Sequence, residues 1–237
     1  MDLPIFTNNI NLPLLYSNNK ITFDPKWLLS ESYGIKGDSA QKEIPDSLKT
    51  HPNCKKRKEN LLSIIKANNY SYDNISSLGN FDFYKIISEF YNIELLTESS
   101  NYGVALYYAL QYQTIYPDNL FLKCVTFNSL YEIFRANQGH RFSMMVDLPS
   151  IYYSEPYNQF LIYLNNIRTN DLKQLCINYA QYTLPEKDAS PYFQYAKVLL
   201  KNIDSTEDKL SGSIINFKKS CIDNYYIKLL ALKVSTK

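Results

Sequence analysis

Two apolar stripes at helical spacing, joined by a short turn that contains proline, fill residues 101–139 and constrain the fold more than any other feature. Residues that recur every three or four positions lie on one face of a helix. The first stripe consists of Ala105, Tyr108, Tyr112 and Ile115. The second consists of Leu120, Cys124, Phe127, Tyr131 and Phe134. Because the connection between them is so short, we expect the two helices to pack antiparallel.

The ends of this predicted hairpin are marked by residues that start or stop helices. Pro117 cannot continue the first helix. Asp118 follows it and is the predicted N-cap of the second helix. Gly139 is the predicted left-handed residue just beyond the end of that helix. We therefore expect a helical hairpin at the centre of the chain.

The composition indicates a folded, soluble chain. Of the 237 residues, 45% are hydrophobic and 20% are charged, which is typical of a globular domain. The formal net charge is +2, and the single basic run, residues 55–58, is too narrow for a nucleic-acid site, so we interpret it as a solvated helix face. The N-terminal residues lack the features of a signal peptide, and no apolar stretch has the length of a transmembrane segment. The cellular compartment stays open.

The remaining sequence predicts an arm followed by one helical domain. Residues 1–45 are rich in proline and asparagine and predict an extended arm, and Trp27 predicts that this arm packs along the body. Residues 46–237 are predicted as a single α-helical domain. Helical spacing and helix-start residues predict further helices over 50–68, 81–95, 157–167, 172–180, 190–199 and 205–221, whereas 225–234 fits a helix or a strand. The predicted fold class is all-α, an irregular array of helical hairpins with an extended N-terminal arm.

The residues that usually carry catalysis or bind metals are sparse. His51 and His140 are the two histidines, and neither has a second ligand one helical turn away. The four cysteines are not near neighbours, and the common nucleophile and phosphate-binding motifs are absent. We therefore assign no catalytic, cofactor-binding or metal-binding residue. An enzyme whose site is assembled from distant residues remains an alternative.

Two stretches resemble known families. The sequence from Ala105 to Asp118, with its paired tyrosines followed by Tyr-Pro-Asp, resembles the second helix and exit turn of a tetratricopeptide repeat. The residues Thr50, His51, Pro52, Arg57 and Leu61 resemble the segment S-x-H-P-x-x-x-x-R-I-x-x-L, which follows the catalytic core of HtpX/BepA-like zinc metallopeptidases. In that family a helical region, often similar to tetratricopeptide repeats, comes next.

The second resemblance implies a function without catalysis in this chain, because the HExxH helix of the family is absent. It implies a helical interaction or regulatory region from the C-terminal part of a bacterial zinc metallopeptidase, in the periplasm or cell envelope. The chain itself would hold no cofactor, zinc would belong to a core upstream, and His51 and Arg57 would lie near the metal cleft. The partner is then that core, or another protein or peptide. The alternative is a stand-alone tetratricopeptide-like module that binds proteins.

Such a module predicts a groove lined by tyrosine, since tyrosine gives contact area at low entropic cost. The candidate lining residues are those that the two central stripes leave free, namely Tyr107, Tyr116 and Asn128. A second interpretation is that the N-terminal arm fills this groove with Phe23 and Trp27. We favour the filled groove, because a proline-rich arm with a tryptophan needs an apolar partner.

Overall fold

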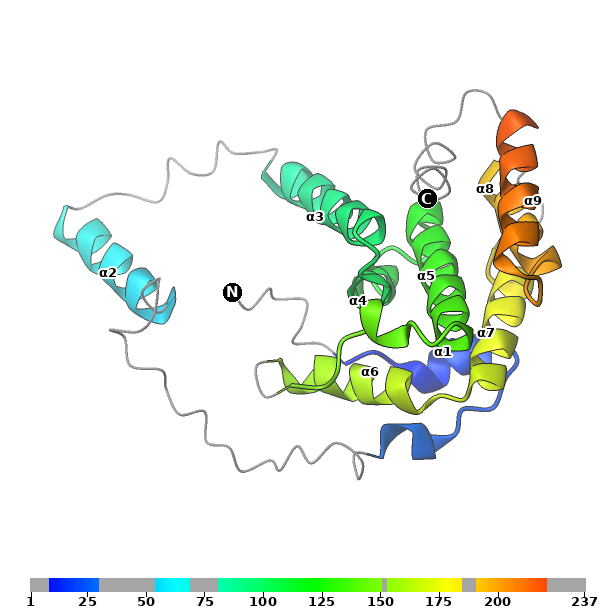
Figure 1. The fold of residues 1–237 in the computed structure, drawn as a ribbon. Coiled ribbons are helices and arrows are strands. Elements are labelled where there is room, and N and C mark those ends of the chain that lie inside the picture. The colour runs from blue at the N-terminus through cyan, green and yellow to red at the C-terminus, as the bar shows by residue number, and fades with distance from the viewer. Residues whose placement is uncertain (1–8, 30–53, 69–80, 151–152, 185–190, 221–237) are drawn as a thin grey trace.

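The computed structural model describes residues 9–29, 54–68, 81–150, 153–184 and 191–220, and all regular secondary structure in these ranges is helical (Figure 1). The predicted all-α class is therefore confirmed. The helices of the first half are α1 (Leu12–Asn18), the 3-10 turn η2 (Pro25–Leu28), α2 (Cys54–Ala67), α3 (Phe81–Glu98) and α4 (Tyr102–Gln113). Those of the second half are α5 (Leu120–Gln138), η5 (Phe142–Met144), α6 (Glu155–Asn166), α7 (Thr169–Tyr182), α8 (Pro191–Lys201) and α9 (Glu207–Ser220).

The predicted hairpin, α4 with α5, forms the centre of the molecule (Figure 1). Helices α3 and α6 pack on α4, while α7 and α8 pack on α5. The two predicted stripes are buried except at their ends. Ile115 is 62% exposed, because α4 stops at Gln113 and the helical period ends there, and Leu120 is half-buried.

The hairpin ends differ by one residue from the prediction. The side chain of Asn119, and not that of Asp118, accepts the backbone N–H of Leu122 at 3.1 Å and caps α5. Gly139 has φ −88°, so it is not left-handed. The next residue, His140, has φ +55°. The His140 N–H donates to the Asn137 carbonyl and the Arg141 N–H donates to the Ala136 carbonyl, which together form a Schellman motif. Gly139 is therefore the C-cap of α5, and the left-handed position predicted for Gly139 falls one residue later, on His140.

The described part of the N-terminal arm is not extended throughout, which corrects that prediction. Asn11 caps α1 by accepting the Leu14 N–H at 3.0 Å, and Pro13 lies in the first turn, where a missing N–H costs nothing. Asp24 and Pro25 start η2 in the same way. The predicted boundary at residue 45 lies outside the described residues.

The arm is nevertheless packed on the body, as Trp27 predicts. The Trp27 side chain is only 6% exposed, and its ring lies 5.1 Å from Tyr16 and 6.3 Å from Tyr163 of α6, measured between centroids. The Tyr16 and Tyr163 hydroxyls hydrogen-bond to each other at 2.8 Å in the interior. Asn166 also donates its side-chain N–H groups to the carbonyls of Trp27 and Leu29.

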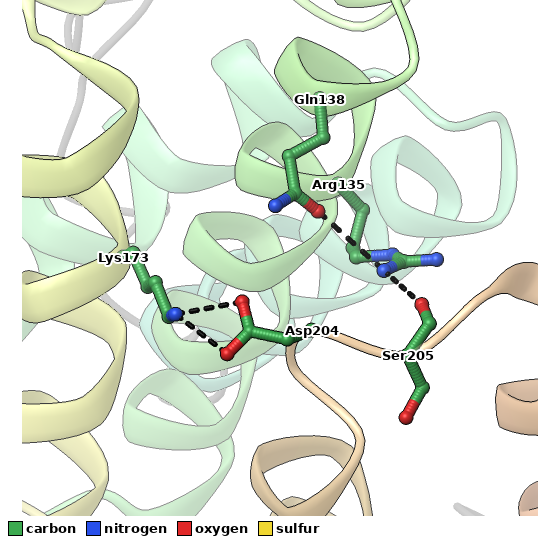
Figure 2. A network of polar contacts seen from close by, with 5 residues as sticks. All are labelled: Arg135, Gln138, Lys173, Asp204 and Ser205. Atoms are coloured by element: carbon green, nitrogen blue, oxygen red, sulfur yellow. Dashed lines mark hydrogen bonds and ion pairs between the residues drawn. The ribbon is translucent and has the colours of Figure 1, made fainter.

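The turn between α8 and α9 is fastened to two earlier helices by charged side chains (Figure 2). Arg135 of α5 donates to the Ser205 carbonyl at 2.8 Å, and Lys173 of α7 pairs with Asp204 at 2.6 Å. The bond from Arg135 is partly buried, so it contributes more than the exposed ion pair, which is worth ~0–1 kcal/mol. The C-terminal hairpin is thereby oriented against the centre.

We expect Phe127→Ala to lower the free energy of unfolding by about 3–5 kcal/mol, because this fully buried ring would leave a cavity at the centre of α5. Chemical denaturation measures the change. Ile215→Ala, at a site 41% exposed, is the control and should cost much less. Equal midpoints for the two variants would contradict the central role of the hairpin.

Removal of residues 1–45 should lower the melting temperature and expose apolar surface, because Tyr16 and Trp27 belong to the main core cluster. Calorimetry and binding of a hydrophobic dye measure the two effects. Asn166→Ala, which removes only the two hydrogen bonds to the arm, should cost about 1–3 kcal/mol. An unchanged melting temperature after truncation would show that the arm is not part of the core.

The protein should unfold in alkali through its buried tyrosines. Burial raises the pKa of Tyr107 from 10.0 to about 12, and burial also raises the pKa of Tyr16 and of Tyr163. Above about pH 10 the unfolded chain therefore binds fewer protons than the folded one, so stability is complete below that pH and falls as the pH rises. The exposed tyrosines should ionise first, and the later phenolate absorbance of the buried tyrosines should rise together with the loss of helical circular dichroism. Full phenolate formation in a chain that remains helical would contradict this coupling.

Candidate protein-interaction surface

Helix α3 carries apolar residues on two opposite faces. The inner face packs on the central hairpin through Ile93, which is fully buried, and Phe90, which is partly buried. The Phe90 ring lies 5.8 Å from Tyr112, 6.0 Å from Tyr116 and 5.7 Å from Phe121, measured between centroids. These contacts fix α3 to both helices of the hairpin.

The opposite face of α3 is apolar and exposed, and we call it the outer face. Its side chains are between 40% and 64% exposed, although they are large and recur at helical spacing. The outer face consists of Tyr84, Ile87, Tyr91 and Leu95. Because single exposed apolar residues are common but grouped ones mark interaction sites, this face is the candidate binding surface.

Acidic residues border the outer face. Glu94 and Glu98 lie three positions after Tyr91 and Leu95, so they follow one edge of the stripe. Along the whole of α3, the four acidic residues and the one lysine give a charge of −4 + 1 = −3. The Glu94 Oε1 atom is buried and has no hydrogen-bond partner among the described residues. A cation beside this edge would offset the cost of that buried oxygen.

Helix α2 is also amphipathic, and it stands away from the other helices (Figure 1). Three of its apolar side chains, Leu61, Leu62 and Ile64, are between 38% and 59% exposed. The helix contains five basic residues and one acidic residue, which give +5 − 1 = +4. Its charge is therefore opposite to that of α3.

The structure does not assemble the groove that the sequence predicts. Tyr107 is fully buried and its ring packs against Tyr157 and Phe160 at 5.0 and 5.2 Å. Asn128 is buried, and Tyr116 is partly buried beside Phe90 of α3.

Within the described residues, the rings that pack on Tyr107 come from α6 and not from Phe23 or Trp27 of the arm, which differs from the predicted filled groove. The arm packs on α6 through Trp27 and Tyr163 instead. Of the other candidate residues, His51 lies outside the described residues, and Arg57 lies in the first turn of α2.

The outer face was visible in the sequence, but its exposure was not. Helical spacing predicts a helix over 81–95 with Tyr84, Ile87 and Phe90 at helical intervals, and the structure separates these residues, since Phe90 packs inward while Tyr84 and Ile87 are exposed. A helix with two apolar faces gives no sign of which face meets a neighbour. The charges Glu94 and Glu98 along the outer face were the available signal, because charged edges favour the solvent side.

The described residues contain no group of three His, Cys, Asp or Glu side chains that could hold a metal ion. In the same part of the chain, every helix falls short of the length and apolar character that membrane crossing requires. Comparisons with models of protein families, with curated protein sequences and with solved structures found no match.

Proposed function

We propose that this chain is a non-catalytic helical region that binds a protein or peptide partner through the outer face of α3. The observation that carries the proposal is the exposure of Tyr84, Ile87, Tyr91 and Leu95 on one face of a helix whose opposite face is fixed to the core. A helix held in this way presents its side chains in a rigid arrangement. A surface formed before binding loses less entropy when a partner arrives.

The chemistry of the outer face defines the partner. Two tyrosines and two aliphatic residues along a helix offer a stripe for another amphipathic helix, with apolar residues three and four positions apart. The adjacent Glu94 and Glu98 favour a partner with lysine or arginine on the matching edge. We therefore propose a basic amphipathic helix as the partner class.

The resemblance to zinc metallopeptidases gives this function a setting. The residues Thr50, His51 and Pro52 resemble the family segment, and α2 begins two residues later at Cys54, in agreement with a helical region that follows a peptidase core. In that setting the chain is a regulatory region of a bacterial metallopeptidase. Any zinc would then be held by the core.

A stand-alone tetratricopeptide-like module would also bind proteins, but through the concave side of its hairpins. Burial of Tyr107 and Asn128 leaves the predicted lining residues inside the core. The outer face of α3 is therefore the proposed binding surface whichever setting the chain has.

The test is selection of short amphipathic helical peptides from a displayed library on the full chain. Peptides that bind should lose more than about 30-fold in affinity for the double variant Ile87→Asp/Tyr91→Asp, since central interface residues contribute about 2 kcal/mol or more. The double variant Met144→Asp/Leu148→Asp alters equally large exposed side chains on another surface and should bind normally. Both variants should keep the melting temperature of the parent chain.

Two results would contradict the proposal. One is a library that yields no binding peptide. The other is a set of peptides that bind the Ile87→Asp/Tyr91→Asp variant as tightly as the parent chain.

A further inference from the structure

We infer that α2 is an internal ligand of the outer face of α3 and folds back on it as an antiparallel helix. This inference rests on the proposed function, because it concerns the same surface. It adds a mode of regulation, since an outside partner would have to displace α2. The two helices stand apart in the structure (Figure 1), and three properties of their surfaces show that they are complementary.

The first property is that both helices leave apolar side chains exposed. Leu61 and Ile64 of α2 are 59% and 52% exposed, and the outer face of α3 is exposed along its length. Contact between the two stripes would remove both from water, and each Å² of apolar surface so buried contributes roughly 25 cal/mol. Among the described residues, α2 is the amphipathic helix that stands clear of the core.

The second property is charge. Helix α2 carries a charge of +4, and Glu94 and Glu98 place two negative charges beside the outer face of α3, whereas Glu89 lies against Tyr112 on the inner face. The basic run of α2, residues 55–58, lies at its N-terminal end, whereas Glu94 and Glu98 lie at the C-terminal end of α3. An antiparallel arrangement brings these two ends together.

The helix dipoles favour the same direction. Basic residues in the first turn of α2 lie at the positive end of their own helix, which is unfavourable for them. Beside the C-terminal end of α3 they would meet the negative end of a dipole together with Glu94 and Glu98. A parallel arrangement would lose this interaction.

The third property is the spacing of the two stripes. In an antiparallel pair of helices, two residues that lie side by side have residue numbers that add to a constant. The 12 residues 69–80 between the two helices are enough to cross the roughly 10 Å between packed helix axes. In the register whose sum is 149, Ile65 would lie beside Tyr84, Leu61 beside Ser88 and next to Ile87, and Lys58 beside Tyr91. In this register, position 54 lies beside position 95.

Because only residues 69–80 separate α2 from α3 in the sequence, α2 would act on the outer face at an effective concentration in the millimolar range. A separate partner must compete with that concentration. Disruption of the α2 stripe should therefore increase the affinity of peptides that bind the outer face.

The test uses Leu95→Cys in the full chain, with oxidised glutathione as the oxidant and Cys54 as the native partner thiol. We expect a disulfide within one chain between Cys54 and the cysteine introduced at position 95, identified by mass spectrometry of its peptides. Two matched variants are controls. Lys85→Cys places a thiol on another side of α3 near its other end. Leu61→Asp/Ile64→Asp, in the Leu95→Cys chain, disrupts the apolar stripe and should slow the bond at least about tenfold, which corresponds to about 1.4 kcal/mol.

Each other result overturns the inference. Equal bond formation from positions 85 and 95 would show random collision. A disulfide between two chains would show that a second copy covers the face, and a bond from position 95 to Cys221 would assign it to the C-terminal residues. Absence of the bond while library peptides bind the outer face would refute the inference alone. Formation of the bond in a chain that binds no library peptide would refute the proposed function alone.

Discussion

Burial of α4 is the constraint on which the rest of this structure depends. Nearly every side chain of this helix is inside, from Tyr102 to Tyr112, so no side of it is left for solvent. Such a helix needs neighbours all round, and α3, α5 and α6 provide them. Small residues make this possible. Gly103 lies so close to the Val146 backbone that an added Cβ would be 3.3 Å from its Cα, and Ala105 and Ala109 pack in the second core cluster with α3.

Tyrosine hydroxyls satisfy part of this crowded interior. Tyr179 of α7 donates to the Gln113 side chain at 3.0 Å, and Gln113 in turn donates to Thr126 of α5. This chain of hydrogen bonds joins three helices at one point. The Tyr16–Tyr163 pair does the same for the arm and α6. Buried polar groups of this kind favour one arrangement of the helices, because a shift would leave them unpaired at a cost of roughly 1–3 kcal/mol each.

The apolar surface that this core does not use is concentrated on α3 and α2. On α3 the inner face is committed to Tyr112 and Phe121 of the hairpin, so the outer face is held in place without being covered. On α2 the apolar stripe belongs to a helix that stands apart from the core. In the proposed mechanism, the outer face of α3 is the binding surface and α2 is the competing ligand within the same chain. The proposed function and its proposed regulation both follow from this division.

The sequence by itself determined the helical class, the central hairpin and the burial of Trp27, because each depends on local periodicity, on Pro117 or on a single large side chain. It also located the helix that carries the outer face, predicted over 81–95 and observed as Phe81–Glu98. The tertiary structure decided which stripes are inside. Tyr107 and Asn128 are covered because α4 and α5 have neighbours on more than one side, whereas the stripe on α3 faces outward because Ile93 occupies the contact with α4. Periodicity shows that a face is apolar, but only the packing of the other helices determines whether that face meets protein or water.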